Sequence, residues 1–377
     1  MSLPHSTIKD VIESGGEWLS SLEKAGQKMN RKHDDIDQPN GNPTEVGAQA
    51  GSATDSGAPR LDPYYQPWLE RLADLPADAY LSPDPEVQSR LMAYFQGALG
   101  TVHAQVLTRE HIVNGPHGPF GVRVYTPPSG EGPWPALIWM HGGAWGGGSL
   151  DMPEGDGVSR EICARTPAVV VSVDYHLANQ AVYWPVPHDD CMAALHWVVE
   201  HSAELGIDAG RVSVGGASAG GNLAAGVALR AKDEGAPKIH SLLLIYPVLY
   251  LDPPPRPQQL REALNRLPPM LGGSGGELDR NSLPWRIFLG PTIQDPSPYA
   301  VPALANVAGL PPTLAVLNEY DGLRTGGEAF AEKLRSAGVR VFEHLEPGVL
   351  HGHLNWVGQL PGADHTIDVM VGLLAAP

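Results

Sequence analysis

Seven short runs of β-branched and aliphatic residues lie between residues 121 and 347, and segments with helical periodicity separate most of them. Continuously apolar runs of this length are typical of strands buried on both faces of a parallel sheet. Because strand and helix alternate repeatedly, the sequence predicts an α/β fold with a mostly parallel central sheet flanked by helices. The expected strands lie within 121–127, 135–141, 167–175, 211–216, 241–248, 311–321 and 339–347, and the expected helices within 154–165, 187–204, 219–233, 324–337 and 354–375.

The composition along the chain indicates three parts. Residues 1–60 combine a weak helical pattern with a polar, turn-rich stretch, and we expect an N-terminal helix and a linker or arm there. Residues 61–110 have helical periodicity and are expected to form the N-terminal part of a helical cap. The strand–helix alternation occupies 111–377, where a segment rich in proline and glycine interrupts it at about 251–300. A long irregular segment inside a compact domain is usually a lid or cap, and we expect that role here.

The charge and the cysteine content exclude several classes of protein. With 25 basic and 42 acidic residues the net charge is −17, which disfavours nucleic acid as a partner because phosphate binding requires clustered lysine and arginine. No run of about 18 apolar residues predicts a transmembrane helix, and the first residues do not resemble a secretory signal. Two cysteines are too few for a disulfide framework. We therefore expect a cytoplasmic protein.

A serine lies in the motif Gly-Ala-Ser-Ala-Gly at 216–220, between an expected strand and an expected helix. In this context the G-x-S-x-G pattern predicts a nucleophile elbow, a tight strand-to-helix turn that presents the hydroxyl of Ser218 outward. The glycines allow the strand and the helix to approach closely. A purely structural turn and a dinucleotide-binding loop are the alternatives, and the second is disfavoured because no acidic residue ends a following strand about 20 residues on.

A second glycine-containing motif, His-Gly-Gly-Ala-Trp at 141–145, directly follows an expected strand. Two glycines at such a position let the backbone turn so that its N–H groups face a cavity, as in an oxyanion hole. We predict that Gly142 and Gly143 donate from this loop and that the backbone N–H of Ala219 is the third donor. His141 is expected to fix the loop by hydrogen bonding.

Two further polar residues follow the last two expected strands. Asp321 comes directly after one of these strands and His351 after the other, so that Ser218, Asp321 and His351 occur in the chain order of an α/β-hydrolase triad. Residues at the carboxyl ends of parallel strands meet at one edge of a sheet, where ligands bind. Glu319 and His353, each two residues away, are the competing candidates for the acid and the base.

Taken together, these motifs resemble the hormone-sensitive-lipase family of α/β-hydrolase esterases. The resemblance rests on HGGAW (141–145), DYHLA (174–178), GASAGGNLAA (216–225), YPV (246–248), LPPTLAV with EYDGLR (310–324) and LHGH (350–353). It implies ester hydrolysis through an acyl-serine intermediate, with a helical cap over the site and with no metal or organic cofactor. It also implies that Ser218 is the nucleophile and that Asp321 and His351 are its partners.

The sequence departs from the family pattern at several positions. Ala217 stands where the family usually has an acidic residue, and Ala144 replaces the last glycine of the usual HGGG. His353 stands at a position that is usually aromatic, and we expect it to line the substrate pocket together with Trp145 and Tyr175.

The sequence therefore predicts a serine carboxylesterase that acts on small-molecule esters, neutral and of small to medium size. A serine acyltransferase or amidase using the same triad is the alternative, and a non-catalytic small-molecule-binding module is a remote one. A homodimer formed through an edge strand near 339–346 is also expected.

Overall fold

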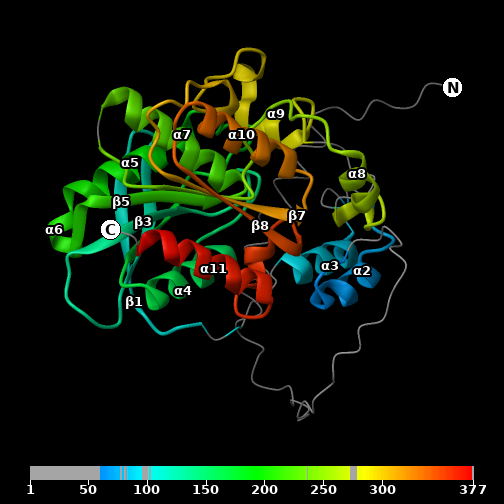
Figure 1. Ribbon diagram of the computed structural model, residues 1–377, viewed down its shortest axis with the longest axis horizontal. Coiled ribbons are helices and arrows are strands. Elements are labelled where there is room, and N and C mark those ends of the chain that lie inside the picture. The colour runs from blue at the N-terminus through cyan, green and yellow to red at the C-terminus, as the bar shows by residue number, and fades with distance from the viewer. Residues whose placement is uncertain are drawn as a thin grey trace, which may run out of the picture.

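A twisted sheet forms the centre of the described part of the protein (Figure 1). The computed structural model describes residues 60–76, 79, 82, 84–95, 101, 103–235, 237–271 and 278–375, and the expected N-terminal helix and arm lie outside them. The strand order is β1-β2-β4-β3-β5-β6-β7-β8, with β2 antiparallel to both neighbours and the strands from β4 to β8 parallel. The predicted mostly parallel sheet is confirmed. The strands are β1 (Leu107–Gly115), β2 (Gly118–Thr126), β3 (Trp134–Met140), β4 (Val169–Asp174), β5 (Ile207–Ala217), β6 (Leu242–Ile245), β7 (Thr313–Tyr320) and β8 (Val341–Leu350).

Strand β1 has no counterpart among the expected strands. It pairs with β2 as an antiparallel hairpin and crosses residue 110, where the sequence suggested a boundary between cap and sheet domain. Most of its side chains are exposed, including Leu107 and Ile112. An edge strand that faces water lacks the continuous apolar run by which the buried strands were predicted.

Side chains that alternate along each strand divide the core into two layers. On β3, Ala136 and Ile138 belong to one apolar cluster and Leu137 and Trp139 to the other. Helices α5, α7 and α10 cover the first face, and α4 and α11 cover the second (Figure 1). The helices of the two layers are α4 (Val158–Arg165), α5 (Val186–Glu200), α6 (Ser202–Leu205), α7 (Ala219–Glu234), α10 (Arg324–Ser336) and α11 (Pro361–Leu374).

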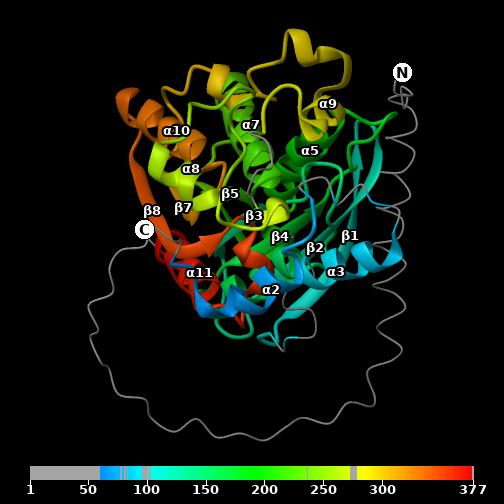
Figure 2. The same ribbon diagram turned by 90° about the vertical axis from the view of Figure 1, so that its right-hand side faces the viewer.

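Both segments that were expected to form a cap contribute short helices. Tyr64, Trp68 and Tyr94 surround the ring of Trp356, so that α2 and α3 are attached to the C-terminal part of the chain (Figure 2). Helix α8 shares their apolar cluster, whereas α9 packs into the cluster on the other face. These elements are η1 (Pro63–Tyr65), α2 (Gln66–Arg71), α3 (Pro85–Phe95), α8 (Gln258–Leu264), η4 (Pro269–Leu271), α9 (Leu283–Leu289), η5 (Gly290–Gln294) and η6 (Pro302–Leu304).

Two expected helices differ in detail. The segment 354–375 divides into η7 (His353–Trp356) and α11, because Gly358 has φ of 81° and Pro361 begins the second helix. The segment 154–165 starts as a π-helix, η3 (Pro153–Gly157), before α4 follows. None of the described helices has the length and apolar character needed to cross a membrane.

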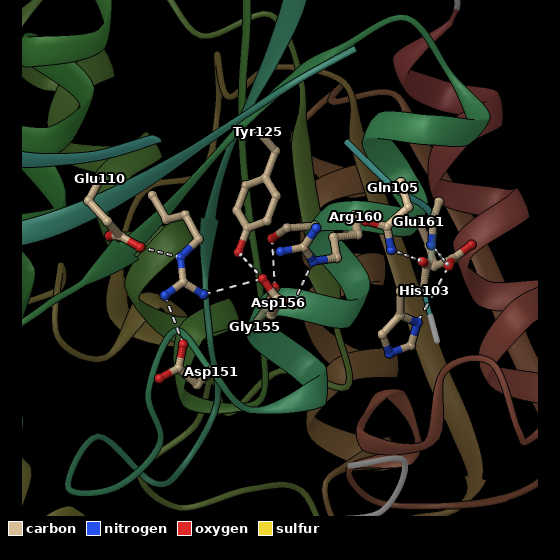
Figure 3. A network of polar contacts seen from close by, with 12 residues as sticks. His103, Gln105, Glu110, Tyr125, Asp151, Gly155, Asp156, Arg160 and Glu161 are labelled. Carbon is tan, nitrogen blue, oxygen red and sulfur yellow. Dashed lines mark hydrogen bonds and ion pairs between the residues drawn. The ribbon is translucent and has the colours of Figure 1, made fainter. Parts of the chain in front are cut away.

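A network of charged side chains anchors η3 to the sheet (Figure 3). Arg123 on β2 donates hydrogen bonds to Glu110, Asp151 and Asp156. The hydroxyl of Tyr125 donates to the same Asp156 carboxylate at 2.9 Å. Because Arg123 and Tyr125 both bond the carboxylate of Asp156, the network ties η3 to β2.

Candidate active site

Ser218 occupies the sharp turn between β5 and α7. Its φ of 55° and ψ of −116° are strained for a residue with a side chain, as a nucleophile elbow requires. A Cβ atom at Gly220 would collide with the carbonyl oxygen of Met140, and one at Gly216 would collide with Gly220. The glycines of the motif are therefore required by close packing between the elbow and the end of β3.

The three residues of the predicted triad lie in hydrogen-bond contact. The Oγ atom of Ser218 is 2.9 Å from Nε2 of His351, and Nδ1 of His351 is 2.7 Å from Oδ2 of Asp321. Because the carboxylate accepts a hydrogen bond from Nδ1–H, Nε2 is left as the acceptor for the serine hydroxyl. Asp321 is buried, whereas 41% of the His351 side chain is exposed, so the imidazole faces solvent on one side.

The competing acid and base have other partners. The Glu319 carboxylate accepts a hydrogen bond from the backbone N–H of Gly348 at 2.8 Å. Nε2 of His353 lies 2.8 Å from the hydroxyl of Thr366. Burial lowers the pKa of His353 to about 3, so this imidazole is neutral at physiological pH. Strand β7 ends at Tyr320, which places Asp321, not Glu319, in the loop that reaches His351.

Opposing effects act on the pKa of His351. Partial burial of the ring lowers this pKa, whereas the negative charges of Asp321 and, less strongly, Glu154 raise it. The net result is a pKa above the usual 6.5. The protonated form of this imidazole is thereby stabilised.

The backbone N–H of Gly142 is already occupied, contrary to the expectation from sequence. It donates to Oε1 of Glu154 at 2.5 Å, and the hydroxyl of Tyr246 donates to the other carboxylate oxygen at 2.6 Å. Gly142 thus has no free donor for an oxyanion. In the described part of the chain, no backbone hydrogen bond uses the N–H of Gly143, Ala144 or Ala219.

Glu154 and Tyr246 form a buried pair that the sequence did not reveal. Glu154 is 2% exposed, and burial raises its pKa above the usual value. The ring of Tyr246 makes edge contacts with both His351 and His353 at centroid distances of 5.1 Å. The YPV motif marked Tyr246 only by resemblance, and the short polar η3 carries no pattern that points to Glu154.

The residues expected to line a substrate pocket are buried instead. Trp145 has no exposed surface and stacks on Phe288 at 4.3 Å with parallel rings. Tyr175 is buried under His141, where its hydroxyl donates to the His141 carbonyl at 2.9 Å. His353 is 2% exposed. Trp145 is covered by Phe288 and Trp285 of α9. Because all three side chains are buried, they do not form a solvent-accessible wall.

Comparisons with known proteins agree with this geometry. Residues 137–355 match the model of a family with the α/β-hydrolase fold. The chain is 35% identical over 274 residues to the esterase LipI of Mycobacterium tuberculosis, covering 70% of this chain and 79% of that protein. It is 39% identical over 251 residues to the carboxylesterase NlhH of the same organism, covering 64% and 73%. A hyperthermophilic esterase from the archaeon Pyrobaculum calidifontis has a TM-score of 0.72 at 30% identity, covering 83% of this chain and 97% of that one. The chain therefore belongs to the hormone-sensitive-lipase-like family of α/β-hydrolases.

Proposed function

We propose that this chain is a serine carboxylesterase in which Ser218, His351 and Asp321 carry out the reaction. Ester hydrolysis as the reaction class follows from the family and from relatives described as esterases and carboxylesterases. The roles of the residues are supported by one observation above all, the continuous hydrogen bonding from Oγ of Ser218 through the His351 ring to Asp321.

The reaction follows from this hydrogen bonding. Oγ of Ser218 attacks the ester carbonyl carbon while Nε2 of His351 takes the hydroxyl proton. The tetrahedral intermediate collapses, the C–O bond to the alcohol breaks, and His351 returns the proton to the leaving alkoxide oxygen. A water molecule then attacks the acyl-serine carbonyl carbon while Nε2 of His351 takes a proton from it. The Oγ–acyl bond breaks to release the acid, and His351 returns the proton to Oγ of Ser218. Asp321 keeps the imidazole in the required tautomer and stabilises its charged form.

The oxyanion hole is proposed to consist of the backbone N–H groups of Gly143, Ala144 and Ala219. The unusual backbone of the loop supports this arrangement, with φ of 116° at Gly143 and 53° at Ala144. Each donor of this kind contributes about 3–4 kcal/mol to stabilisation of the transition state. Glu154 is a positioning residue, because it fixes the loop through Gly142 without reaching the substrate.

The substrates are proposed to be neutral esters of small to medium size. The net charge of −17, together with the buried carboxyl groups of Asp321 and Glu154 beside the site, disfavours an anionic substrate. A neutral p-nitrophenyl butyrate should therefore be hydrolysed with a higher kcat/KM than an aryl hemisuccinate of similar size.

Replacement of the nucleophile tests the proposal. Ser218→Ala should lower hydrolysis of p-nitrophenyl butyrate by about 10⁴-fold or more, with an unchanged circular dichroism spectrum. A fluorophosphonate probe should label the wild-type protein at Ser218 and leave the variant unlabelled. Near-wild-type turnover in the folded variant would contradict the proposal.

Amide substrates and acceptor alcohols, assayed in the same preparation, distinguish the esterase from an amidase or an acyltransferase.

We also propose a homodimer formed through β8. This strand pairs only with β7 among the described strands, and Phe342 and Leu345 on it are 44% and 39% exposed. A free sheet edge with exposed apolar side chains can pair with its copy. Sedimentation velocity should give a dimer for the wild type and a monomer for Phe342→Lys, and a monomeric wild type would exclude this interface.

A cytoplasmic location remains part of the proposal. Cys163 and Cys191 are buried free thiols, and burial raises the pKa of Cys163 to about 12. Unpaired thiols are typical of proteins in reducing compartments. Cell fractionation with an antibody against the chain tests this location, and recovery from the medium or the periplasm would contradict it.

A further inference from the structure

Two histidines and a buried glutamate converge where β8 meets α11, outside the catalytic site. His344 and Glu346 are two residues apart on β8 and therefore lie on the same side of that strand. His365 comes from the first turns of α11. Nε2 of His344 is 2.8 Å from Oε2 of Glu346, and Nδ1 of His365 is 3.1 Å from the same oxygen. The three ligand atoms all lie within 4.8 Å of one another.

The burial of Glu346 requires an explanation. Its side chain is only 3% exposed, and among the described residues no lysine or arginine forms an ion pair with it. A carboxylate removed from water is normally paired with a cation or bound to a metal. The described partners are the two imidazoles and the hydroxyl of Thr366, which donates to Oε2 at 3.3 Å.

We propose that His344, Glu346 and His365 bind one divalent transition-metal ion, for which Zn²⁺ fits best. Two imidazole nitrogens and one carboxylate oxygen are a ligand set that Zn²⁺ prefers, whereas Ca²⁺ and Mg²⁺ take oxygen ligands. Ligands about 2.0–2.2 Å from a tetrahedral ion lie roughly 3.3 Å apart, and the two closest pairs are already near that separation.

The surroundings of the three residues suit such a site. The side chain of His365 is 54% exposed and that of His344 is 26% exposed, so an ion can enter from solvent and water can fill the fourth position. Thr366 donates to the carboxylate oxygen and fixes its orientation, as outer partners of metal ligands do. His353 in turn lies 2.8 Å from the Thr366 hydroxyl.

The site joins the last strand to the last described helix, which gives the ion a structural role. Strand β8 leads to the loop that carries His351, and α11 covers one face of the sheet. An ion bound only by the folded chain stabilises that state by mass action. The ion takes no part in ester hydrolysis, since none of its ligands contacts Ser218, Asp321 or His351 in the described contacts.

Zinc binding to the untagged full-length chain tests the proposal. After treatment with a chelator and its removal, titration with Zn²⁺ by calorimetry should show one ion per chain, and the melting temperature should rise by a few degrees. The variant His344→Ala/His365→Ala should lose this binding and the rise in melting temperature. Each single variant should weaken the affinity at least about tenfold.

A matched control separates this site from adventitious histidine binding. His196 is an exposed histidine on α5, and His196→Ala should bind Zn²⁺ as the wild type does. Circular dichroism establishes that each variant is folded before the titration. The proposal is overturned if the folded double variant binds Zn²⁺ with the stoichiometry and affinity of the wild type, or if the wild type shows no saturable binding at micromolar Zn²⁺.

Discussion

The carboxylate of Glu154 accepts a hydrogen bond from the backbone N–H of Gly142 at 2.5 Å. A side chain from η3 therefore determines which backbone N–H groups of the HGGAW loop remain free to bind an oxyanion. The hydroxyl of Tyr246 holds the other carboxylate oxygen, and Arg123 anchors η3 through Asp156. Glu154 thus positions the loop of the proposed oxyanion hole, and Tyr246 and the Arg123–Asp156 contact hold Glu154 and η3 in turn. Fully satisfied networks of this kind restrict the geometry of a site.

The Glu154 contact predicts a graded effect of substitution on turnover. Glu154→Ala leaves the Gly142 N–H and the Tyr246 hydroxyl without a partner, at a cost of about 1–3 kcal/mol for each buried donor. Displacement of the loop should lower kcat by about 10–100-fold, with a smaller change in KM. Glu154→Gln keeps one acceptor and should lie between the alanine variant and the wild type.

Steady-state kinetics on neutral aryl esters measure this effect, with Glu234→Gln on the exposed end of α7 as the control. Equal kcat in Glu154→Ala and the wild type would show that the loop keeps its position without the carboxylate.

The raised pKa of His351 predicts the acid limb of the pH profile. The imidazole must be neutral to accept the Ser218 proton, so kcat/KM falls as the pH drops through the pKa of His351. Because Asp321 and Glu154 raise this pKa, the inflection should lie above pH 6.5. Glu154→Gln removes one of the two charges and should move the inflection to lower pH. Measurement of kcat/KM from pH 5 to 9 in both proteins gives the two inflection points. A wild-type inflection below pH 6.5 would be inconsistent with a His351 pKa raised by the two carboxylates.

The two neighbouring histidines should respond very differently to substitution. His351→Asn removes the proposed base and should lower kcat/KM by about 10⁴-fold or more. His353→Phe should retain most of the activity, because His353 is a neutral, buried side chain whose ring contacts Tyr246 and whose Nε2 meets Thr366. Parallel assays of the two variants check this, and a comparable loss in both would indicate that His353 also acts on the reacting groups.

Trp145 should contribute mainly to stability. Its ring is fully buried against Phe288 and Trp285, with centroid distances of 4.3 and 4.6 Å. Trp145→Ala should therefore lower the free energy of unfolding by about 3–5 kcal/mol, as measured by urea denaturation. The partly buried Trp197 provides the control, since its replacement by alanine should cost less. A cost at position 145 no greater than at 197 would mean that the ring is not part of the tightly packed core.

The sequence by itself determined the features that depend on local pattern. Apolar runs predicted the buried strands, because a strand covered on both faces needs apolar side chains at successive positions. The G-x-S-x-G motif placed Ser218, since the elbow depends on residues adjacent in the chain. Asp321 and His351 were found because each follows the end of a strand.

Only the tertiary structure decided which groups meet across the fold. Whether the Gly142 N–H is free depends on a carboxylate twelve residues away, and the burial of Trp145 depends on α9, which the chain reaches more than a hundred residues later. Likewise His365 approaches Glu346 only because α11 packs beside β8. Whether a backbone N–H is free to donate, or a side chain can bind a metal, depends on the residues that pack against it. Spacing along the chain does not specify which residues those are.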